Sequence, residues 1–75
     1  MKDKEFEIRG IKITGEHIKL DSLLKFAAIA STGGEAKILI QNGDVMVDDK
    51  VCTSRGKKII PGAVVKCCGE AILVK

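Results

Sequence analysis

The chain has 75 residues, with 13 Lys plus Arg against 10 Asp plus Glu and a formal net charge of +3. This length suits one small domain, and a hydrophobic content of 45% favours a folded chain over a disordered one. No apolar run approaches the roughly 18 residues of a membrane span, and no apolar segment follows the charged N-terminus. We therefore expect neither a membrane span nor a secretory signal.

The cysteines limit the redox and metal chemistry of the chain. Three cysteines, of which Cys67 and Cys68 are adjacent, argue against a disulfide framework and favour a reducing cytoplasm. Only His17 is available to join them as a ligand, and no C-x-x-C spacing is present, so we expect no metal and no cofactor. We interpret Cys67 and Cys68 as one inward-facing and one outward-facing residue of a strand.

The first elements are a strand and a helix. Residues 5–14 alternate charged and apolar side chains, but Gly10 shifts the parity. This pattern predicts one strand with a glycine bulge, or two short strands. From Leu20 the period changes, and an amphipathic helix of about 10 residues is predicted. Its apolar positions follow the i, i+3, i+4, i+7 spacing at Leu20, Leu23, Leu24 and Ala27.

A second helix is predicted directly after the first. Thr32-Gly33-Gly34-Glu35 matches the Ser/Thr-x-x-Glu capping box that opens helices. Its buried stripe would consist of Ala36, Leu39 and Ile40, and Gly43 would be its C-terminal cap. The two helices would form a short helix-turn-helix-like corner.

The rest of the chain has the pattern of strands and turns. Val45 and Val47 alternate before an Asp48-Asp49 turn and a strand at Val51. Pro61-Gly62 predicts a type II turn, and residues 64–67 with 71–74 predict a closing hairpin. The order of elements predicts an α+β domain, with two short helices packed on one face of a small, mostly antiparallel sheet.

Positive charge is concentrated in one loop. Ser54-Arg55-Gly56-Lys57-Lys58 places three cations around a glycine, which predicts a mobile loop that can follow a phosphate backbone. A merely solvated loop is the open alternative. Gly33 and Gly34 leave the first amides of the second helix bare, as in anion sites, with Lys37 one turn along. A tight turn between the helices would also explain these two glycines.

No constellation of catalytic residues is predicted. The Gly-Gly-x-x-Lys segment lacks the spacing of a P-loop, and His17 has no evident nucleophile partner. We interpret His17 as a surface or capping residue. Asp48 and Asp49 suit a turn rather than a pair of catalytic carboxylates.

Together these segments resemble the S4-type RNA-binding domain family over about residues 16–74. The chain is most similar to the stand-alone bacterial YaaA/YbcJ-like subgroup. In that subgroup the second helix opens with Ser-Gly-Gly-x-Ala-Lys, and a basic loop follows the hairpin. The matching residues are Lys19-Leu20-Asp21, Leu24, Thr32-Gly33-Gly34-Glu35-Ala36-Lys37, Ile40, Gly43, Val45, Val47, Arg55-Gly56-Lys57-Lys58 and Pro61-Gly62.

The resemblance implies an αL-type RNA-binding motif in a single S4-like domain over residues 1–75. It implies a non-catalytic cytoplasmic protein, not bound to a membrane, that grips structured RNA, in particular ribosomal RNA or a ribosomal particle. It leaves open which RNA is bound and the oligomeric state. Carried over residue by residue, the candidate RNA contacts are Lys19, Lys25, Thr32, Gly33, Gly34, Lys37, Arg55, Lys57 and Lys58.

The chain departs from the family pattern at three places. Asp48-Asp49 replaces the common Asn-Gly turn, which loses the preferred residues of a type I′ turn and adds two negative charges near the presumed RNA. Ala63 replaces a common Asp. Gly33-Gly34 stands where the wider family often has Ser-Arg, so one cation is missing at the helix start.

Two alternatives come from other functional classes. A β-grasp protein-interaction or carrier module would share the small size and the Val-rich hairpin, but such carriers need a flexible C-terminal Gly-Gly where this chain has Val74-Lys75. An enzyme would need a partner chain, because S4-type domains serve catalysis when they are fused to a separate catalytic domain.

Overall fold

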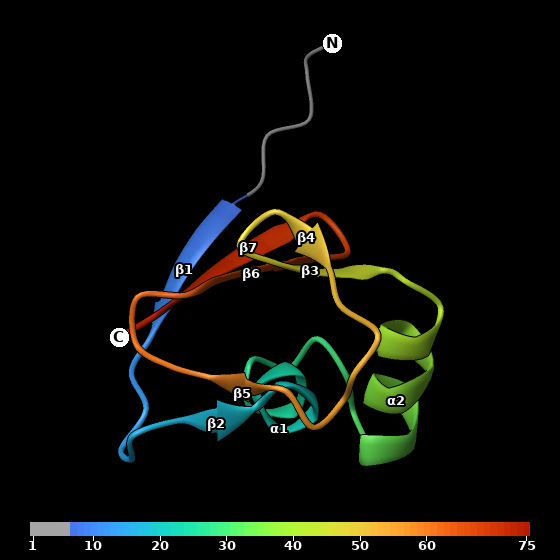
Figure 1. The fold of residues 1–75 in the computed structure, drawn as a ribbon, viewed down its shortest axis with the longest axis horizontal. Helices are drawn as coiled ribbons and strands as arrows, with labels where there is room; N and C mark the ends of the chain where they lie inside the picture. The colour runs from blue at the N-terminus through green and yellow to red at the C-terminus, as the bar shows by residue number, and fades with distance from the viewer. Residues whose placement is uncertain (1–6) are drawn as a thin grey trace, which may run out of the picture.

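The computed structural model of the protein describes residues 7–75, in which two short helices pack on one face of a five-stranded sheet (Figure 1). The elements in chain order are β1 (Glu7–Ile11), β2 (Ile18–Lys19), α1 (Leu20–Phe26), α2 (Gly33–Gln41), β3 (Val45–Val47), β4 (Lys50–Val51), β5 (Lys58–Ile59), β6 (Val64–Cys67) and β7 (Glu70–Val74). The sheet order is β1-β7-β6-β3-β4, and β2 pairs with β5 in a separate ribbon. This confirms the predicted α+β class.

The sheet is antiparallel except at one edge. β6 pairs antiparallel with both β3 and β7, whereas β1 runs parallel to β7. The core between the sheet and the helices is aliphatic, as the scarcity of aromatic residues requires. Its largest fully buried side chains are Leu20, Leu23, Leu24, Ile40, Val45, Ile59, Val65, Ile72 and Val74. Neither described helix is long and apolar enough to cross a bilayer.

The predicted glycine bulge in the first strand is wrong. β1 keeps an unbroken register against β7, from Glu7 opposite Glu70 to Ile11 opposite Val74. Ile8 and Ile11 lie on opposite faces of a regular strand. Ile8 is 72% exposed, whereas Ile11 packs against the core, so no bulge is needed to bury both. Within residues 7–14 the structure has neither a bulged strand nor two short strands, because the single strand ends at Ile11. Residues 5 and 6 lie outside the described range.

Helix α1 is shorter than predicted, with seven residues rather than about ten. It ends because Ala28 adopts a left-handed conformation, with a φ of 62°. The amides of Ala28 and Ile29 donate to the carbonyls of Lys25 and Leu24, at 3.0 and 2.9 Å, which is a Schellman motif. The predicted inward stripe is confirmed, since Leu20, Leu23, Leu24 and Ala27 are all buried.

Helix α2 begins and ends as predicted. The Thr32 hydroxyl accepts from the Glu35 amide at 3.1 Å. The Glu35 carboxylate accepts a hydrogen bond at 2.6 Å, although from the amide of Ser31 rather than from that of Thr32. Gly43, with a φ of 82°, closes a second Schellman motif after the helix. Ala36 and Ile40 are buried and Leu39 is half-buried.

The three predicted turns are confirmed. The Gly62 φ of 101° and a 3.1 Å bond from the Ala63 amide to the Ile60 carbonyl fit a type II turn at Pro61-Gly62. Cys68-Gly69 connects β6 to β7 with two positive φ values. Cys67 is buried in β6 and Cys68 is exposed, as predicted, but Cys68 belongs to the turn rather than to a strand.

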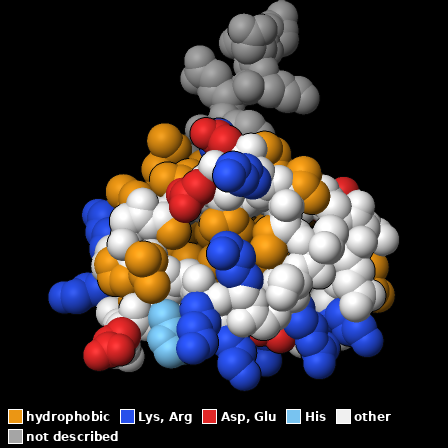
Figure 2. All heavy atoms as spheres, in the orientation of Figure 1, with side chains coloured by type: hydrophobic (Ala, Val, Ile, Leu, Met, Phe, Trp, Pro, Cys, Tyr) orange, Lys and Arg blue, Asp and Glu red, His pale blue; other side chains and the backbone are white. Residues whose placement is uncertain are grey.

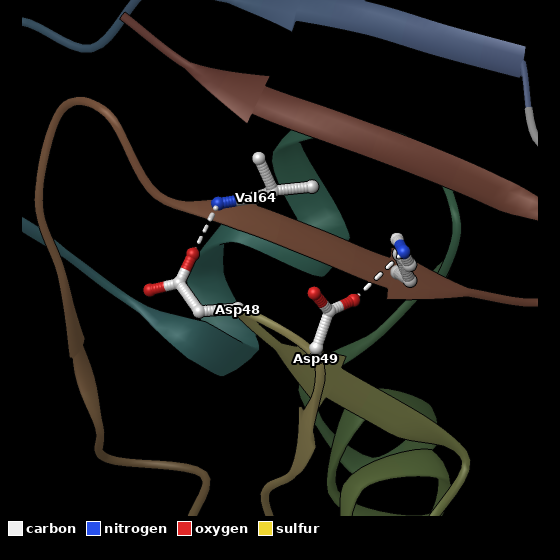
Figure 3. Close-up of polar contacts among 4 residues, drawn as sticks. Asp48, Asp49 and Val64 are labelled. Atoms are coloured by element: carbon white, nitrogen blue, oxygen red, sulfur yellow. Dashed lines mark hydrogen bonds and ion pairs between the residues drawn. The ribbon is translucent and has the colours of Figure 1, made fainter.

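The Asp48-Asp49 turn adopts two positive φ values, 51° and 71°, despite lacking Asn and Gly. Contacts to β6 stabilise it (Figure 3). Asp48 Oδ1 accepts from the Val64 amide at 3.0 Å, and Asp49 Oδ1 lies 2.9 Å from Lys66 Nζ. The two carboxylates are thus directed to β6, and the turn lies at the sheet side of the molecule (Figure 1). Asp48 also lines a pocket together with Ser54 and Lys57 of the basic loop. The expected proximity of these two charges to bound RNA stays a prediction.

Candidate nucleic-acid interface

The two-stranded ribbon aligns two of the candidate cations. In the β2–β5 pair, Lys19 lies directly opposite Lys58, and Ile18 lies opposite Ile59. Alternation along each strand places Ile59 in the core and both lysines in solvent. The ribbon was not predicted, because two residues per strand are too few to produce a recognisable period.

The basic loop is bound to the start of α1 through its backbone. The Leu20 amide donates to the Lys57 carbonyl at 2.9 Å, and the Asp21 amide donates to the Arg55 carbonyl at 3.2 Å. Lys19, the N-cap residue of α1, makes no side-chain cap, so these loop carbonyls satisfy helix amides that would otherwise lack a partner. A 3.2 Å bond from the Lys57 amide to the Ser54 carbonyl closes the turn. The loop predicted to be mobile is therefore tethered.

We call Lys19, Arg55, Lys57 and Lys58 the basic edge. Because their backbones are held by the β2–β5 ribbon and by α1, their exposed side chains extend from one connected surface. Among the side chains of residues 8–75 there are two ion pairs, Arg9–Glu70 and Lys66–Asp49, and neither uses a member of the basic edge. Figure 2 shows Lys and Arg side chains gathered along the lower side of the molecule. These cations are available to an anionic partner.

The start of α2 lies on the same lower side as the basic edge (Figure 1). Neither Gly33 nor Gly34 has a positive φ, and a Cβ at Gly33 would meet nothing within 4 Å. Packing therefore does not demand glycine at position 33, which leaves close approach of a ligand to the backbone as a reason for it. Thr32 and Lys37 are exposed beside them. The carboxylate of Glu35 also lies at this helix end, where it competes with any bound anion.

The structure separates Lys25 from the other candidates. It lies in the last turn of α1, at the opposite end of that helix from the basic edge, and it lines a cavity together with Phe26. His17 is exposed and does not cap α1, so of its two interpretations only the surface one fits. Asp21 has one buried carboxylate oxygen, Oδ1, without a hydrogen-bond partner.

The side chains of residues 8–75 offer no assembled metal centre. No group of three His, Cys, Asp or Glu residues in this range could hold a metal ion. Cys67 and Cys68 bring their sulfurs to 2.8 Å, but burial, and after it the neighbouring thiol, raises the pKa of Cys67 to about 12. A thiol with so high a pKa is a poor nucleophile and a poor ligand at neutral pH.

Sequence reasoning missed two features of this surface. One is the backbone contact between the loop and α1, which joins residues more than 30 positions apart and leaves no periodic pattern. The other is the cavity at Phe26. Its only signal was an aromatic residue at a helical position outside the leucine stripe.

Three comparisons connect the chain to known proteins. The family model described as "S4 domain" matches residues 11–75. The protein named "Putative RNA-binding protein YbcJ" from Escherichia coli (strain K12) is 38% identical over 58 residues, which cover 77% of this chain and 83% of that protein. "Probable ribosome maturation protein RlbA" from Bacillus subtilis (strain 168) is 38% identical over 56 residues, covering 75% and 79%.

The fold has a solved counterpart. The solution structure of Escherichia coli YbcJ, whose description assigns it an αL motif involved in RNA binding, matches with a TM-score of 0.64 at 30% identity. The match covers 99% of this chain and 92% of the YbcJ chain. The predicted αL arrangement of two helices on a mostly antiparallel sheet is thereby confirmed.

Proposed function

The chain belongs to the S4 domain family, and we propose that it is a non-catalytic protein that binds structured RNA. The basic edge carries this proposal. Its cations are exposed, lie on connected backbone and have no acidic partner among the described residues. A cluster of this kind neutralises phosphates, which dominate the affinity of proteins for nucleic acids. The name and the αL motif of YbcJ support the same function.

The proposed contacts are directed at the backbone and shape of RNA. The major groove of an RNA helix is too narrow for side chains to read, so a folded RNA would be recognised through phosphates and 2′-hydroxyl groups. The lysines and Arg55 would contact phosphates, and the amides of Gly33 and Gly34 would add a helix N-terminus. The proposed contact residues are Lys19, Lys25, Thr32, Gly33, Gly34, Lys37, Arg55, Lys57 and Lys58.

We propose ribosomal RNA, free or in a ribosomal particle, as the target. The relative named as a ribosome maturation protein supports this choice. The cytoplasm is the proposed location, which suits the three free cysteines. Membership of the S4 family, with two consecutive helices before the β3–β4 hairpin, disfavours the alternative of a β-grasp carrier.

Binding to fragments of ribosomal RNA over a salt series tests this function. With four to six phosphate contacts, the slope of log affinity against log salt should be about −3 to −5. Reversal of Arg55 and Lys57 to Glu should weaken binding to all structured fragments by a similar factor and make the slope shallower by about 2.

The matched control reverses two exposed lysines that are not among the proposed contacts, Lys50 and Lys75. It changes the net charge by the same amount, so it should retain most of the affinity. If the wild type binds no fragment at low salt, or if both double variants lose affinity equally, the proposed surface is wrong.

A further inference from the structure

A second surface feature lies next to the basic edge. A cavity of about 570 Å³ is lined by residues of α1 and of the β1–β2 connection. That connection lies at the lower left of Figure 1. Its volume falls within the roughly 300–1,000 Å³ of small-molecule sites. The side chains that matter for its chemistry are those of Lys12, Thr14, His17, Ser22, Lys25 and Phe26.

Phe26 is an unusual residue in this protein. It is the only Phe, Tyr or Trp between positions 8 and 75, yet it is 63% exposed, whereas the leucines of α1 are fully buried. Leu20, Leu23 and Leu24 point into the core, and Phe26, in the last turn, lies at the cavity instead. Aromatic side chains are common in the lining of ligand sites.

The charge around the ring selects an anionic ligand. Lys12 and Lys25 both line the cavity and are exposed, and neither belongs to the two ion pairs among the side chains of residues 8–75. Among the described residues that line the cavity, none is Asp or Glu. Glu16 is exposed on the same connection but is not a lining residue.

We propose that this cavity accepts one unpaired nucleotide of the bound RNA. The base would stack on the ring of Phe26, and its flanking phosphates would lie at Lys12 and Lys25. Stacking on an aromatic side chain, with cations at the backbone, is how proteins hold unstacked nucleotides. The hydroxyls of Thr14 and Ser22 can donate to or accept from the edge of the base. This inference rests on the proposed RNA binding and specifies which feature of the RNA is recognised.

The cavity and the basic edge are positioned for one RNA molecule. Ile18 lines the cavity, and Lys19, the next residue of β2, belongs to the basic edge opposite Lys58. Because Ile18 and Lys19 are consecutive residues, the two sites adjoin at β2. A helical segment on the basic edge could thus place a displaced nucleotide in the cavity.

Two RNA hairpins that differ only by one unpaired nucleotide in the stem test this proposal. The wild type should bind the bulged hairpin more tightly, by roughly 5- to 100-fold, as expected for one stacked base. Phe26→Leu should abolish that preference while leaving the affinity for the continuous hairpin unchanged. Ile8→Ala, at an exposed apolar position on β1, is the matched control and should keep the preference.

Proton NMR of the ring gives an independent measurement. The resonances of Phe26 should move upfield when the bulged hairpin is added and should stay in place with the continuous one. Because Phe26 is largely exposed, Phe26→Leu should fold, and its retained binding to the continuous hairpin verifies this.

The outcomes separate the two proposals. Equal affinity of the wild type for both hairpins, or a preference that survives Phe26→Leu, overturns the nucleotide site but leaves RNA binding intact. Ring resonances that respond to neither RNA also overturn it and leave the cavity to a protein partner. Failure to bind either hairpin at low salt overturns both proposals.

Discussion

Lys19 and Lys58 lie directly opposite each other in the β2–β5 ribbon, with Ile18 and Ile59 as the neighbouring cross-strand pair. Like charges at opposed positions destabilise a strand pair, and neither lysine has an acidic partner among the side chains of residues 8–75. The apolar pair next to them holds the ribbon together, with Ile59 in the core. A local arrangement that opposes stability is expected where a surface serves binding.

Lys58→Glu should therefore stabilise the fold and weaken RNA binding. The change replaces a repulsive pair by an attractive one, and we expect the free energy of unfolding to rise by about 0.5 kcal/mol at low salt. Urea unfolding at two salt concentrations measures this, since the gain should shrink as salt screens the pair. Lys50→Glu, opposite Val47, is the control and should show no gain. A loss of stability in Lys58→Glu would contradict the prediction.

The ends of the two helices offer a matched pair of substitutions. Both helices end in Schellman motifs, but the left-handed residue is Ala28 after α1 and Gly43 after α2. A left-handed conformation costs an L-residue about 1 kcal/mol, and Ala28 is exposed. Ala28→Gly should raise the free energy of unfolding by about 0.5 kcal/mol after the entropy cost of glycine in the unfolded chain.

Gly43→Ala should have the opposite effect, with a loss of about 1 kcal/mol. Thermal or urea unfolding of the two variants checks both signs. Equal destabilisation by the two substitutions would show that the conformation at Ala28 is not the source of strain.

Arg9 connects β1 to the end of α1. Its Nη2 donates to the carbonyl of Ala27, and its Nε lies 3.3 Å from Glu70 Oε1. Since the side chains of Arg9 and Glu70 are 42% and 40% exposed, the ion pair contributes little to the free energy of unfolding. The bond to a carbonyl at the helix C-terminus contributes more, because it satisfies a helix carbonyl with a cation.

We expect Arg9→Met, which keeps the aliphatic part, to reduce the free energy of unfolding by about 1 kcal/mol. Glu70→Gln should cost only a few tenths, on the order of an exposed ion pair. Chemical denaturation of the two variants compares the contacts. A larger loss in Glu70→Gln would assign the stability to the ion pair instead.

The buried thiol of Cys67 predicts a loss of stability at alkaline pH. Burial raises its pKa from 9.0 to about 12 in the folded protein. Between these values the unfolded chain releases the proton while the folded protein keeps it, so stability falls as pH rises from 9.0 towards 12. The difference in unfolding free energy between the wild type and Cys67→Ala should shrink over this range. A constant difference would contradict the assigned cause.

Glu35 is predicted to limit RNA affinity. Its carboxylate holds the Ser31 amide at 2.6 Å, beside the bare amides of Gly33 and Gly34. Glu35→Gln retains an acceptor oxygen but removes a negative charge from the helix start. We expect RNA affinity to rise about two- to fivefold and stability to fall slightly, because the helix dipole loses its anion. Titration with the same ribosomal RNA fragment measures the change, and weaker binding would contradict the prediction.

Local signals predicted much of this fold. Helix caps and tight turns depend on hydrogen bonds between residues a few positions apart, so they can be predicted from sequence. Examples are Thr32 and Glu35 at the start of α2, Gly43 at its end and the Pro61-Gly62 turn. The leucine stripe of α1 was predicted for the same reason. The end of α1 was not, because Ala28 takes a conformation that an alanine seldom adopts.

Contacts between distant segments escaped prediction. The parallel pairing of β1 with β7 decides that Ile8 is exposed, so no bulge is needed at Gly10. The carbonyls of Arg55 and Lys57 reach α1 through the tertiary fold. The sequence therefore predicted which residues form the candidate site. It could not show that Lys25 lies at a separate cavity while the loop cations share the basic edge.

The most direct measurement is the mapping of the RNA-binding surface by two-dimensional NMR of the isotope-labelled protein. Titration with a structured ribosomal RNA fragment should shift the amide resonances of Lys19, residues 33–37 and residues 54–58, while the Cys68-Gly69 turn stays unchanged. Shifts confined to the Cys68-Gly69 turn, with none at the basic edge, would contradict the account.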